Sequence, residues 1–189
     1  MPKHELSPTE VRTGICRASY ANIWQPKSTD GGKEKYGVSI IIPKSDTKTV
    51  DAINAAIKAA YDEGKSKLKG NGKTVPALPG LKTPLRDGDE ERPDDENYAD
   101  SYFLNANSDY EPQIFDRFKD PITDQKKVYS GCYCKFFINF YAFSFNGNKG
   151  IAAGLNGIQL IRDGEPLGGR KNAADIFDVE DDDDDDFLG

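Results

Sequence analysis

Hydrophobic and polar residues alternate along most of this chain with the two-residue period of a β-strand. Runs with this pattern, bounded by glycine, proline and asparagine, predict strands at 11–20, 35–42, 101–106, 113–115, 127–145 and 157–162. In one stretch the apolar spacing is helical, from a cap at Ser45 or Asp46 to a stop at Gly64. Because the strands are short and outnumber the helices, the pattern predicts a mainly β fold, either a small barrel or a sandwich.

The most informative run is 131–145, which alternates over its whole length. Alternate residues of a strand face opposite ways, so this run has two faces. One face is apolar throughout and suits a core: Cys132, Cys134, Phe136, Ile138, Phe140 and Ala142. The other combines rings with a cation and an amide: Tyr133, Lys135, Phe137, Asn139, Tyr141 and Phe143.

Single-stranded nucleic acid matches that second face, because bases stack on rings and phosphates pair with cations. The sequence therefore predicts a nucleic-acid-binding face that includes Tyr133, Lys135, Phe137, Asn139 and Tyr141. The alternative is a strand buried on both faces, with the second set of rings in a further core layer. Burying Lys135 and Asn139 without partners would cost free energy, which favours the exposed interpretation.

Further candidates for nucleic-acid binding lie beside the predicted strands. Around the first connection they are Tyr20, Trp24, Lys33, Lys35 and Tyr36, and before the long run they are Arg117 and Lys119. Each cation alone is typical of an ordinary solvated surface. Trp24 is either a core residue or a platform for a base. The lysine- and glycine-rich stretch at 65–73 is expected to be a loop.

Charge is divided unevenly along the chain. The net charge is −7, but nine of the 32 acidic residues lie in 175–189, where no basic residue occurs. The rest of the chain has 23 acidic against 25 basic residues, a net charge of +2. We therefore expect three parts: a flexible N-terminus at 1–10, a domain at 11–170 that carries the predicted nucleic-acid-binding face, and a disordered acidic tail at 171–189.

The tail contains six consecutive aspartates, followed by two apolar residues: Asp181, Asp182, Asp183, Asp184, Asp185 and Asp186, then Phe187 and Leu188. Held near a basic groove, these carboxylates would compete with DNA phosphates for it. Once DNA displaces the tail, the carboxylates and Phe187 become available to partner proteins. The alternative is a tail that only improves solubility, although solubility alone does not need apolar residues at its end.

Reactive groups for catalysis are scarce. The acidic stretch 87–96 could hold metal ions in principle, but its uninterrupted charge is typical of a solvated loop. His4 is the only histidine, so neither a zinc site nor an activated cysteine nucleophile is expected. The three cysteines are expected to be reduced thiols, and no apolar run approaches the ~20 residues that span a bilayer. We therefore expect a binding protein with no enzyme activity, no cofactor, no metal and no membrane contact.

Three stretches resemble a family of phage proteins first described as a domain of unknown function and since recognised as single-stranded DNA-binding proteins, among them one from an Enterobacter phage. The most specific stretch is 130–169, SGCYCKFFINFYAFSFNGNKGIAAGLNGIQLIRDGEPLGG. The others are 19–46 and FLNANS at 103–108. This resemblance implies an OB-like five-stranded barrel with insertions and one main helix.

It also implies protection of single-stranded DNA, without sequence specificity, during phage replication and recombination in the cytoplasm of the infected bacterial host. The acidic tail is similar to those of other phage and bacterial single-stranded DNA-binding proteins, which contact polymerase, helicase-primase or repair enzymes. Here Phe187 is third from the end and is followed by Leu188 and Gly189, which departs from that pattern. The alternative function is an acidic interaction or DNA-mimic protein that binds no nucleic acid, and a homodimer is left open.

Overall fold

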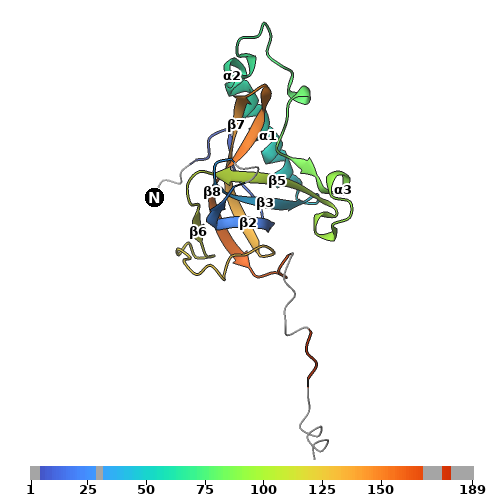
Figure 1. The fold of residues 1–189 in the computed structure, drawn as a ribbon, viewed down its shortest axis with the longest axis vertical. Helices are drawn as coiled ribbons and strands as arrows, with labels where there is room; N and C mark the ends of the chain where they lie inside the picture. Colours follow the sequence, from blue (N-terminus) through green and yellow to red (C-terminus); the bar gives the residue numbers. More distant parts are fainter. Residues whose placement is uncertain (1–4, 29–31, 168–175, 180–189) are drawn as a thin grey trace, which may run out of the picture.

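The computed structural model describes residues 5–28, 32–167 and 176–179 (Figure 1). In this part of the chain the strands are β1 (Glu10–Arg12), β2 (Cys16–Lys27), β3 (Lys35–Pro43), β4 (Arg86–Asp87), β5 (Ser101–Ser108), β6 (Gln113–Phe115), β7 (Tyr133–Phe145) and β8 (Asn148–Arg162). The helices are α1 (Thr47–Glu63), α2 (Lys65–Lys69) and α3 (Gly88–Glu91), with short 3-10 helices η1 (Leu78–Gly80) and η2 (Glu96–Tyr98).

Five strands pair in a closed ring, in the order β7-β2-β3-β5-β8, and the pairing of β7 with β8 closes it. Neighbours in the ring are antiparallel except β5 and β8, which run parallel. Three short strands extend the ring: β1 pairs with β7, β4 with β5, and β6 with β8. The expected mainly β fold, with an OB-like arrangement of five strands, insertions and one main helix, is confirmed.

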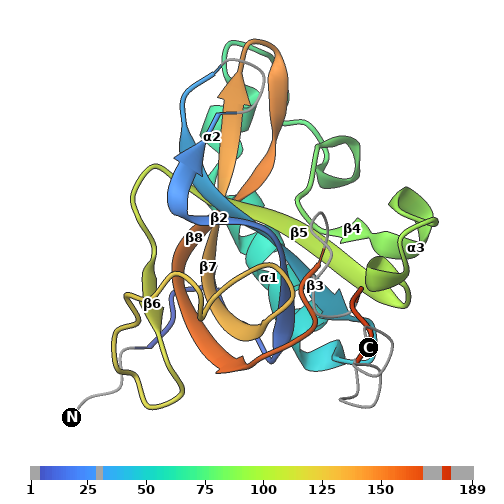
Figure 2. The ribbon, with the colours of Figure 1, turned by 60° about the horizontal axis from the view of Figure 1, so that its bottom comes forward.

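The hairpin of β7 and β8 is the longest element of the sheet. Its residues pair from Tyr133 opposite Arg162 to Phe145 opposite Asn148. Asn146 and Gly147 turn the chain with positive φ angles of 49° and 80°, which suits a tight hairpin turn. Figures 1 and 2 show the hairpin curving through the body, with its tip projecting beside α2.

The core fills the ring and the space between the ring and α1. The apolar face of β7 is buried as predicted, because its alternate residues from Cys132 to Ala142 are at most 6% exposed. Helix α1 contributes its buried face, which includes Ile53 and Ile57, to the same cluster. Its predicted limits are also confirmed, since Asp46 accepts a hydrogen bond from the backbone N–H of Thr49 and the helix ends at Glu63, before Gly64.

The first predicted strand is wrong in its limits. The stretch 11–20 contains β1 and the start of β2, and β2 continues to Lys27. The register of β2 against β3 shifts between Ser19 and Asn22, where Tyr20 has a positive φ of 45°. An irregularity of this kind bends a strand and redirects its side chains, and the hydrophobic alternation does not predict it.

Three further element predictions are wrong. The strand expected at 127–145 begins only at Tyr133. The first five residues of the expected loop at 65–73 form α2, which is held by the fully buried Leu68. The last strand begins at Asn148 instead of residue 157, because glycines that suggested turns lie inside β8. At Gly150 a Cβ atom would meet the carbonyl of Lys82, so the glycine serves close packing.

The division into parts at 1–10, 11–170 and 171–189 stays a prediction. Strand β1 begins at Glu10, at the end of the expected flexible N-terminus. Most of the expected tail, including its aspartate run, lies outside the described residues.

Candidate nucleic-acid interface

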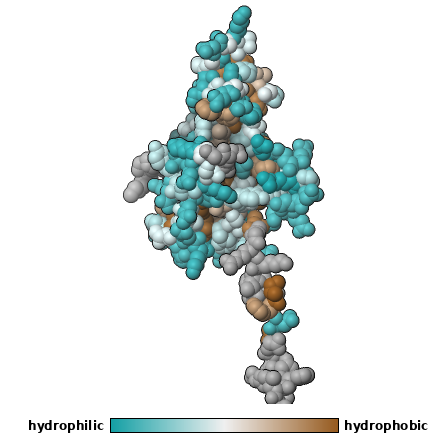
Figure 3. Space-filling model, in the orientation of Figure 1, coloured by the Kyte–Doolittle hydropathy of each residue, from teal (hydrophilic) through white to brown (hydrophobic). Residues whose placement is uncertain are grey.

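The second face of β7 carries the side chains predicted to bind nucleic acid. Phe137 is 37% exposed and Tyr141 is 44% exposed, while Tyr133, Lys135, Asn139 and Phe143 are half-buried. The alternative of a strand buried on both faces is therefore wrong. We call the outward residues of β7, from Tyr133 to Phe145, the outer β7 stripe. Figure 3 shows a mainly hydrophilic surface with small hydrophobic areas on the face in view.

A groove of about 810 Å³ lies over β3 and β5, and we call it the β3–β5 groove. It combines cations, exposed rings and amides: Lys27, Lys33, Lys35, Tyr20, Phe145, Asn22, Asn105 and Asn107. Gly37 keeps part of its floor free of side chains, because a Cβ atom there would meet the amide oxygen of Asn107. Rings and lysines thus line one open trough, which is the combination that unpaired nucleic acid needs.

Tyr20 reaches the groove from the irregular part of β2, and its side chain is 60% exposed. The guanidinium group of Arg92 lies 5.4 Å from its ring centre and also 5.0 Å from that of the buried Tyr98. Tyr98 is fixed in turn by a hydrogen bond of 3.0 Å from its hydroxyl to Ser19 Oγ. Arg92 therefore holds the Tyr20 ring against the body by a cation–π contact.

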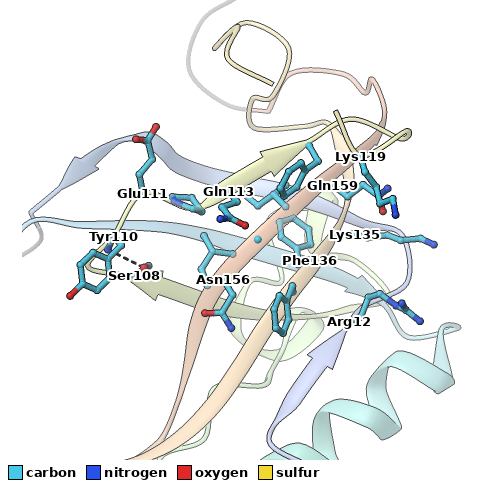
Figure 4. Close-up of a pocket in the computed structure, with 16 residues that line it drawn as sticks. Arg12, Ser108, Tyr110, Glu111, Gln113, Lys119, Lys135, Phe136, Asn156 and Gln159 are labelled. Atoms are coloured by element: carbon cyan, nitrogen blue, oxygen red, sulfur yellow. Dashed lines mark hydrogen bonds between the residues drawn. The ribbon is translucent and has the colours of Figure 1, made fainter. Parts of the chain in front are cut away.

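A second hollow, of about 680 Å³, is lined by β6, β7, β8 and the chain between β5 and β6, and we call it the β6–β7 hollow (Figure 4). Three residues predicted from the sequence line it, Lys119, Lys135 and Phe137. The sequence-based prediction named these residues, together with Tyr20 and Lys33, as candidates for nucleic-acid binding. The structure divides them between two hollows.

The outer β7 stripe connects the two hollows. Its end, Phe145, lines the β3–β5 groove, and Phe137 lines the β6–β7 hollow. Between them, Asn139 accepts a hydrogen bond of 3.1 Å from the amide of Asn156. Burial raises the pKa of Tyr141, and the nearby carboxylate of Asp109 raises it further.

Six predicted residues line neither of the two hollows: Trp24, Tyr36, Arg117, Tyr133, Asn139 and Tyr141. Trp24 packs against the core, and its indole N–H donates to the carbonyl of Val128 at 2.9 Å. The guanidinium group of Arg162 lies 4.3 Å from the centre of the Tyr133 ring. Tyr36 is half-buried on β3, and Arg117 lines a smaller hollow near Phe118. A role in DNA binding for these six stays a prediction.

Sequence reasoning missed several lining residues. Phe145 continues the alternation of the predicted face by one step, so the same pattern could have identified it. Arg12, Tyr110 and Asn156 come from separate elements and have no local signal, because only the folded ring brings them to β7.

The acidic stretch 87–96 starts with the last residue of β4 and contains α3, and an ion-pair cluster ties it to Lys44, the residue after β3. Lys44 Nζ lies 2.9 Å from a carboxylate oxygen of Asp87 and 2.8 Å from one of Asp89. These contacts, through the Lys44 ammonium, lower the pKa of both carboxyls, and the two carboxylates raise the pKa of Lys44. Among the described residues no group of three or more His, Cys, Asp or Glu is placed to hold a metal ion.

The three cysteines lie in the core as free thiols, as expected. Burial raises the pKa of Cys16 to about 12, so this thiol stays protonated near neutral pH. Cys132 and Cys134 lie with their sulfur atoms 3.5 Å apart, and this contact with Cys132, together with burial, raises the pKa of Cys134. In the part of the chain that the structure covers, helices long and apolar enough for a membrane crossing are absent.

Comparisons with known proteins identify relatives over nearly the whole chain. The family described as Enterobacter phage Enc34, ssDNA-binding protein, matches residues 9–188. Protein p50 of Acyrthosiphon pisum secondary endosymbiont phage 1 is 32% identical over 174 residues, which cover 89% of this chain and 92% of p50.

Among the solved structures that share the fold are two single-stranded DNA-binding proteins of phages. The single-stranded DNA-binding protein from bacteriophage Enc34, in complex with ssDNA, matches with a TM-score of 0.69 at 22% identity, covering 88% of this chain and 97% of the other. The single-stranded DNA-binding protein gp2.5 of bacteriophage T7 matches with a TM-score of 0.60 at 17% identity, covering 92% and 96%. On the strength of the family match, this chain belongs to the Enc34 phage single-stranded DNA-binding protein family.

Proposed function

We propose that this protein binds single-stranded DNA without sequence specificity and that the β3–β5 groove is its main binding surface. The observation that carries the proposal is the groove itself, where Tyr20 and Phe145 lie with Lys27, Lys33 and Lys35 in one open trough. Rings stack on bases of any kind, and lysines neutralise phosphates. The surface therefore suits an unpaired strand of any sequence.

The position of the groove in the fold supports this proposal. OB-folds bind oligonucleotides over their second and third strands, between the loop joining strands one and two and the loop joining strands four and five. In chain order the ring strands are β2, β3, β5, β7 and β8, so the groove covers the second and third. Lys33 follows the first strand, and Phe145 ends the fourth. Family membership supports the same function.

In the cell, we propose that the protein covers and protects single-stranded DNA during phage replication and recombination, in the cytoplasm of the infected host. Its role is binding, without a catalytic step. The acidic run Asp181–Asp186 competes with DNA for the lysines of the groove and, once displaced, recruits replication proteins such as polymerase or helicase-primase. The division of charge between body and tail supports this part of the proposal.

Substitution of the two groove rings tests the main proposal. Tyr20→Ala and Phe145→Ala should each weaken binding of the full-length protein to fluorescent oligo-dT by ~1–3 kcal/mol, because each removes a stacking platform. Phe118→Ala is the matched control, since Phe118 is 81% exposed but lies outside the groove. Unchanged affinity for both groove variants, with the wild type binding, would place the DNA elsewhere. Shortening of the oligonucleotide with added magnesium or manganese would indicate a nuclease instead.

Removing the charges of the tail tests whether the tail competes with DNA for the β3–β5 groove. Replacing Asp181–Asp186 by asparagine keeps the tail length and should tighten binding to oligo-dT at low salt, because the tethered competitor loses its charge. The difference in affinity between the two proteins should shrink as salt is raised, because salt screens the attraction between the aspartates and the groove lysines. Equal affinities of the two proteins at low salt would contradict the competition while leaving DNA binding itself intact.

A further inference from the structure

We propose that the β6–β7 hollow is a second base-binding site, which takes nucleotides of the same strand beyond those held in the β3–β5 groove. The inference rests on the proposed function, because it assigns the rest of the path to DNA already bound in the main groove. It predicts a footprint with two segments, of which only long oligonucleotides reach the second.

The walls of the hollow suit a nucleobase. Its floor is apolar, formed by the buried side chains of Phe136, Leu155 and Ile158. The ring of Phe137 and the 82% exposed ring of Tyr110 stand at its margin. The volume of about 680 Å³ lies within the range of ~300–1,000 Å³ typical of sites for small organic ligands. An unstacked base can therefore lie against a ring over an apolar surface.

Amide groups provide polar contacts at the same place. The side-chain N–H of Asn156 donates to Asn139, and that of Gln159 donates to the carbonyl of Arg117 at 3.3 Å. These bonds hold both amides in position. Each keeps a carbonyl oxygen that can accept a hydrogen bond from a base amino group. The hollow thus offers stacking together with contacts to base edges.

The charges around the hollow match a phosphate backbone along one side. Arg12, Lys119 and Lys135 all line it, and Figure 4 shows them on one side of the hollow. Glu111 lies on the opposite side in the same view. A single strand could place its phosphates along the cationic side and its bases against the ring of Phe137. Cations on one side and a ring on the other favour a ligand that has both a negatively charged backbone and flat rings, such as single-stranded nucleic acid.

Continuity with the main groove favours DNA over another occupant. Asn107 of β5 lines the groove, and the next residue, Ser108, lines the hollow. Asp109 follows and is paired with the groove residue Lys33 at 3.6 Å. The exposed ring of Tyr141 lies on the outer β7 stripe between Phe145 and Phe137. A strand that leaves the groove along the outer β7 stripe therefore passes Tyr141 and Asn139, and also the carboxylate of Asp109, before it reaches the hollow.

A length series of oligo-dT separates the two sites. We expect Phe137→Ala and the double variant Lys119→Ala/Lys135→Ala to weaken binding of long oligonucleotides about 5-fold or more, because each base or phosphate contact in the hollow is lost. Short oligonucleotides that fill only the groove should bind these variants as they bind the wild type. Phe118→Ala and Lys58→Ala, at exposed positions outside both hollows, are the matched controls. Thermal unfolding of each variant verifies that it is folded.

Three results would overturn the inference. Affinity of Phe137→Ala that matches the wild type at every length, while Tyr20→Ala weakens binding, shows that DNA stays in the groove. An equal loss at every length shows that the hollow belongs to one undivided site. A change in the affinity for long oligonucleotides that disappears when Asp181–Asp186 are replaced by asparagine shows that the hollow holds the tail. If the wild type binds no oligonucleotide of any length, the proposed function itself fails.

Discussion

Phe136 and Phe137 are neighbours in the chain with opposite surroundings. Phe136 is 1% exposed and belongs to the core, whereas Phe137 is 37% exposed on the outer β7 stripe. Alternation along a strand is the whole cause of the difference. The pair therefore sets a core ring, which also lines the floor of the β6–β7 hollow, beside an exposed ring.

Substitution of each phenylalanine by alanine should affect a different property, stability for Phe136 and DNA binding for Phe137. Phe136→Ala should lower the free energy of unfolding by ~3–5 kcal/mol, because it leaves a cavity in the core. Phe137→Ala should leave stability nearly unchanged and cost ~1–3 kcal/mol in binding to long oligo-dT, because it removes a stacking ring. Chemical denaturation and fluorescence titration measure the two quantities. A large loss of stability in Phe137→Ala would show that its ring is part of the core.

At this scale the sequence predicted the two faces of β7 correctly, because a two-residue period needs no knowledge of the rest of the fold. It could not divide the candidate residues between two hollows. Lys33 and Lys119 are both basic residues beside strands, and only the closed ring places one in the β3–β5 groove and the other in the β6–β7 hollow. Trp24 shows the same limit, since its contact with Val128 joins residues far apart in the chain.

Helix α1 ends in close contact with the β7–β8 hairpin. A Cβ atom on Gly64 would meet the Cβ atom of Ala142 and the carbonyl of Ala60. The backbone φ of Gly64 is −98°, so its small size matters here and its conformational freedom does not. Glycine thus permits close contact between helix and strand.

Replacing Gly64 should therefore destabilise the protein. We expect Gly64→Ala to lower the free energy of unfolding by ~1–3 kcal/mol, since the added methyl group overpacks the contact. Gly80→Ala is the control, because a Cβ atom there meets nothing within 4 Å. Thermal or urea unfolding measures both. Similar stability of the two variants would mean that α1 and the hairpin lie farther apart.

The ion-pair cluster of Lys44 links the acidic segment to β3 and should make stability depend on pH. The lowered pKa values of Asp87 and Asp89 mean that the folded state binds fewer protons than the unfolded state in acid. Their contribution is present above the ordinary carboxyl pKa of about 4 and is lost as pH falls through the lowered values. Because the pKa of Lys44 is raised, the stability that Lys44 contributes is fully present below its ordinary pKa of about 10. It is lost only as pH rises through the raised value.

Lys44→Met should therefore lower the melting temperature at pH 7 and have a smaller effect at pH 3 or below. Lys48→Met, at an exposed position of α1, is the control and should change the melting temperature little at either pH. Circular dichroism melts across this range measure the effect. An equal decrease in melting temperature at pH 7 and in acid would show that Lys44 stabilises the protein by packing and not by charge.

Element limits were predictable where a local signal exists and not elsewhere. The cap at Asp46 and the stop at Gly64 are local, and both are confirmed. The shift in β2 at Tyr20 and the position of Gly150 inside β8 depend on what packs against them, which the sequence does not give. Helix α2 forms because Leu68 is buried by tertiary contacts, although its flanking lysines and glycines suggested a loop.

The whole molecule combines a ring of strands with two hollows joined by the outer β7 stripe. Closure of the ring pairs β7 with β8 and β2 and places β5 beside β8, so each hollow collects residues from distant parts of the chain. The sequence predicted the mainly β class, and the family resemblance supplied the five-stranded arrangement. Both hollows place rings beside cations, which is the physical basis of the proposed DNA binding.

The most direct test is a titration of the full-length protein with fluorescent oligo-dT and with its duplex at several salt concentrations. We predict tighter binding to the single strand, with log affinity falling linearly with log salt by about 0.7 per phosphate neutralised. Lys33→Ala/Lys35→Ala should bind more weakly and give a shallower slope, because two phosphate contacts are lost. A protein that ignores oligo-dT at low salt, with or without its aspartate run, would contradict the account.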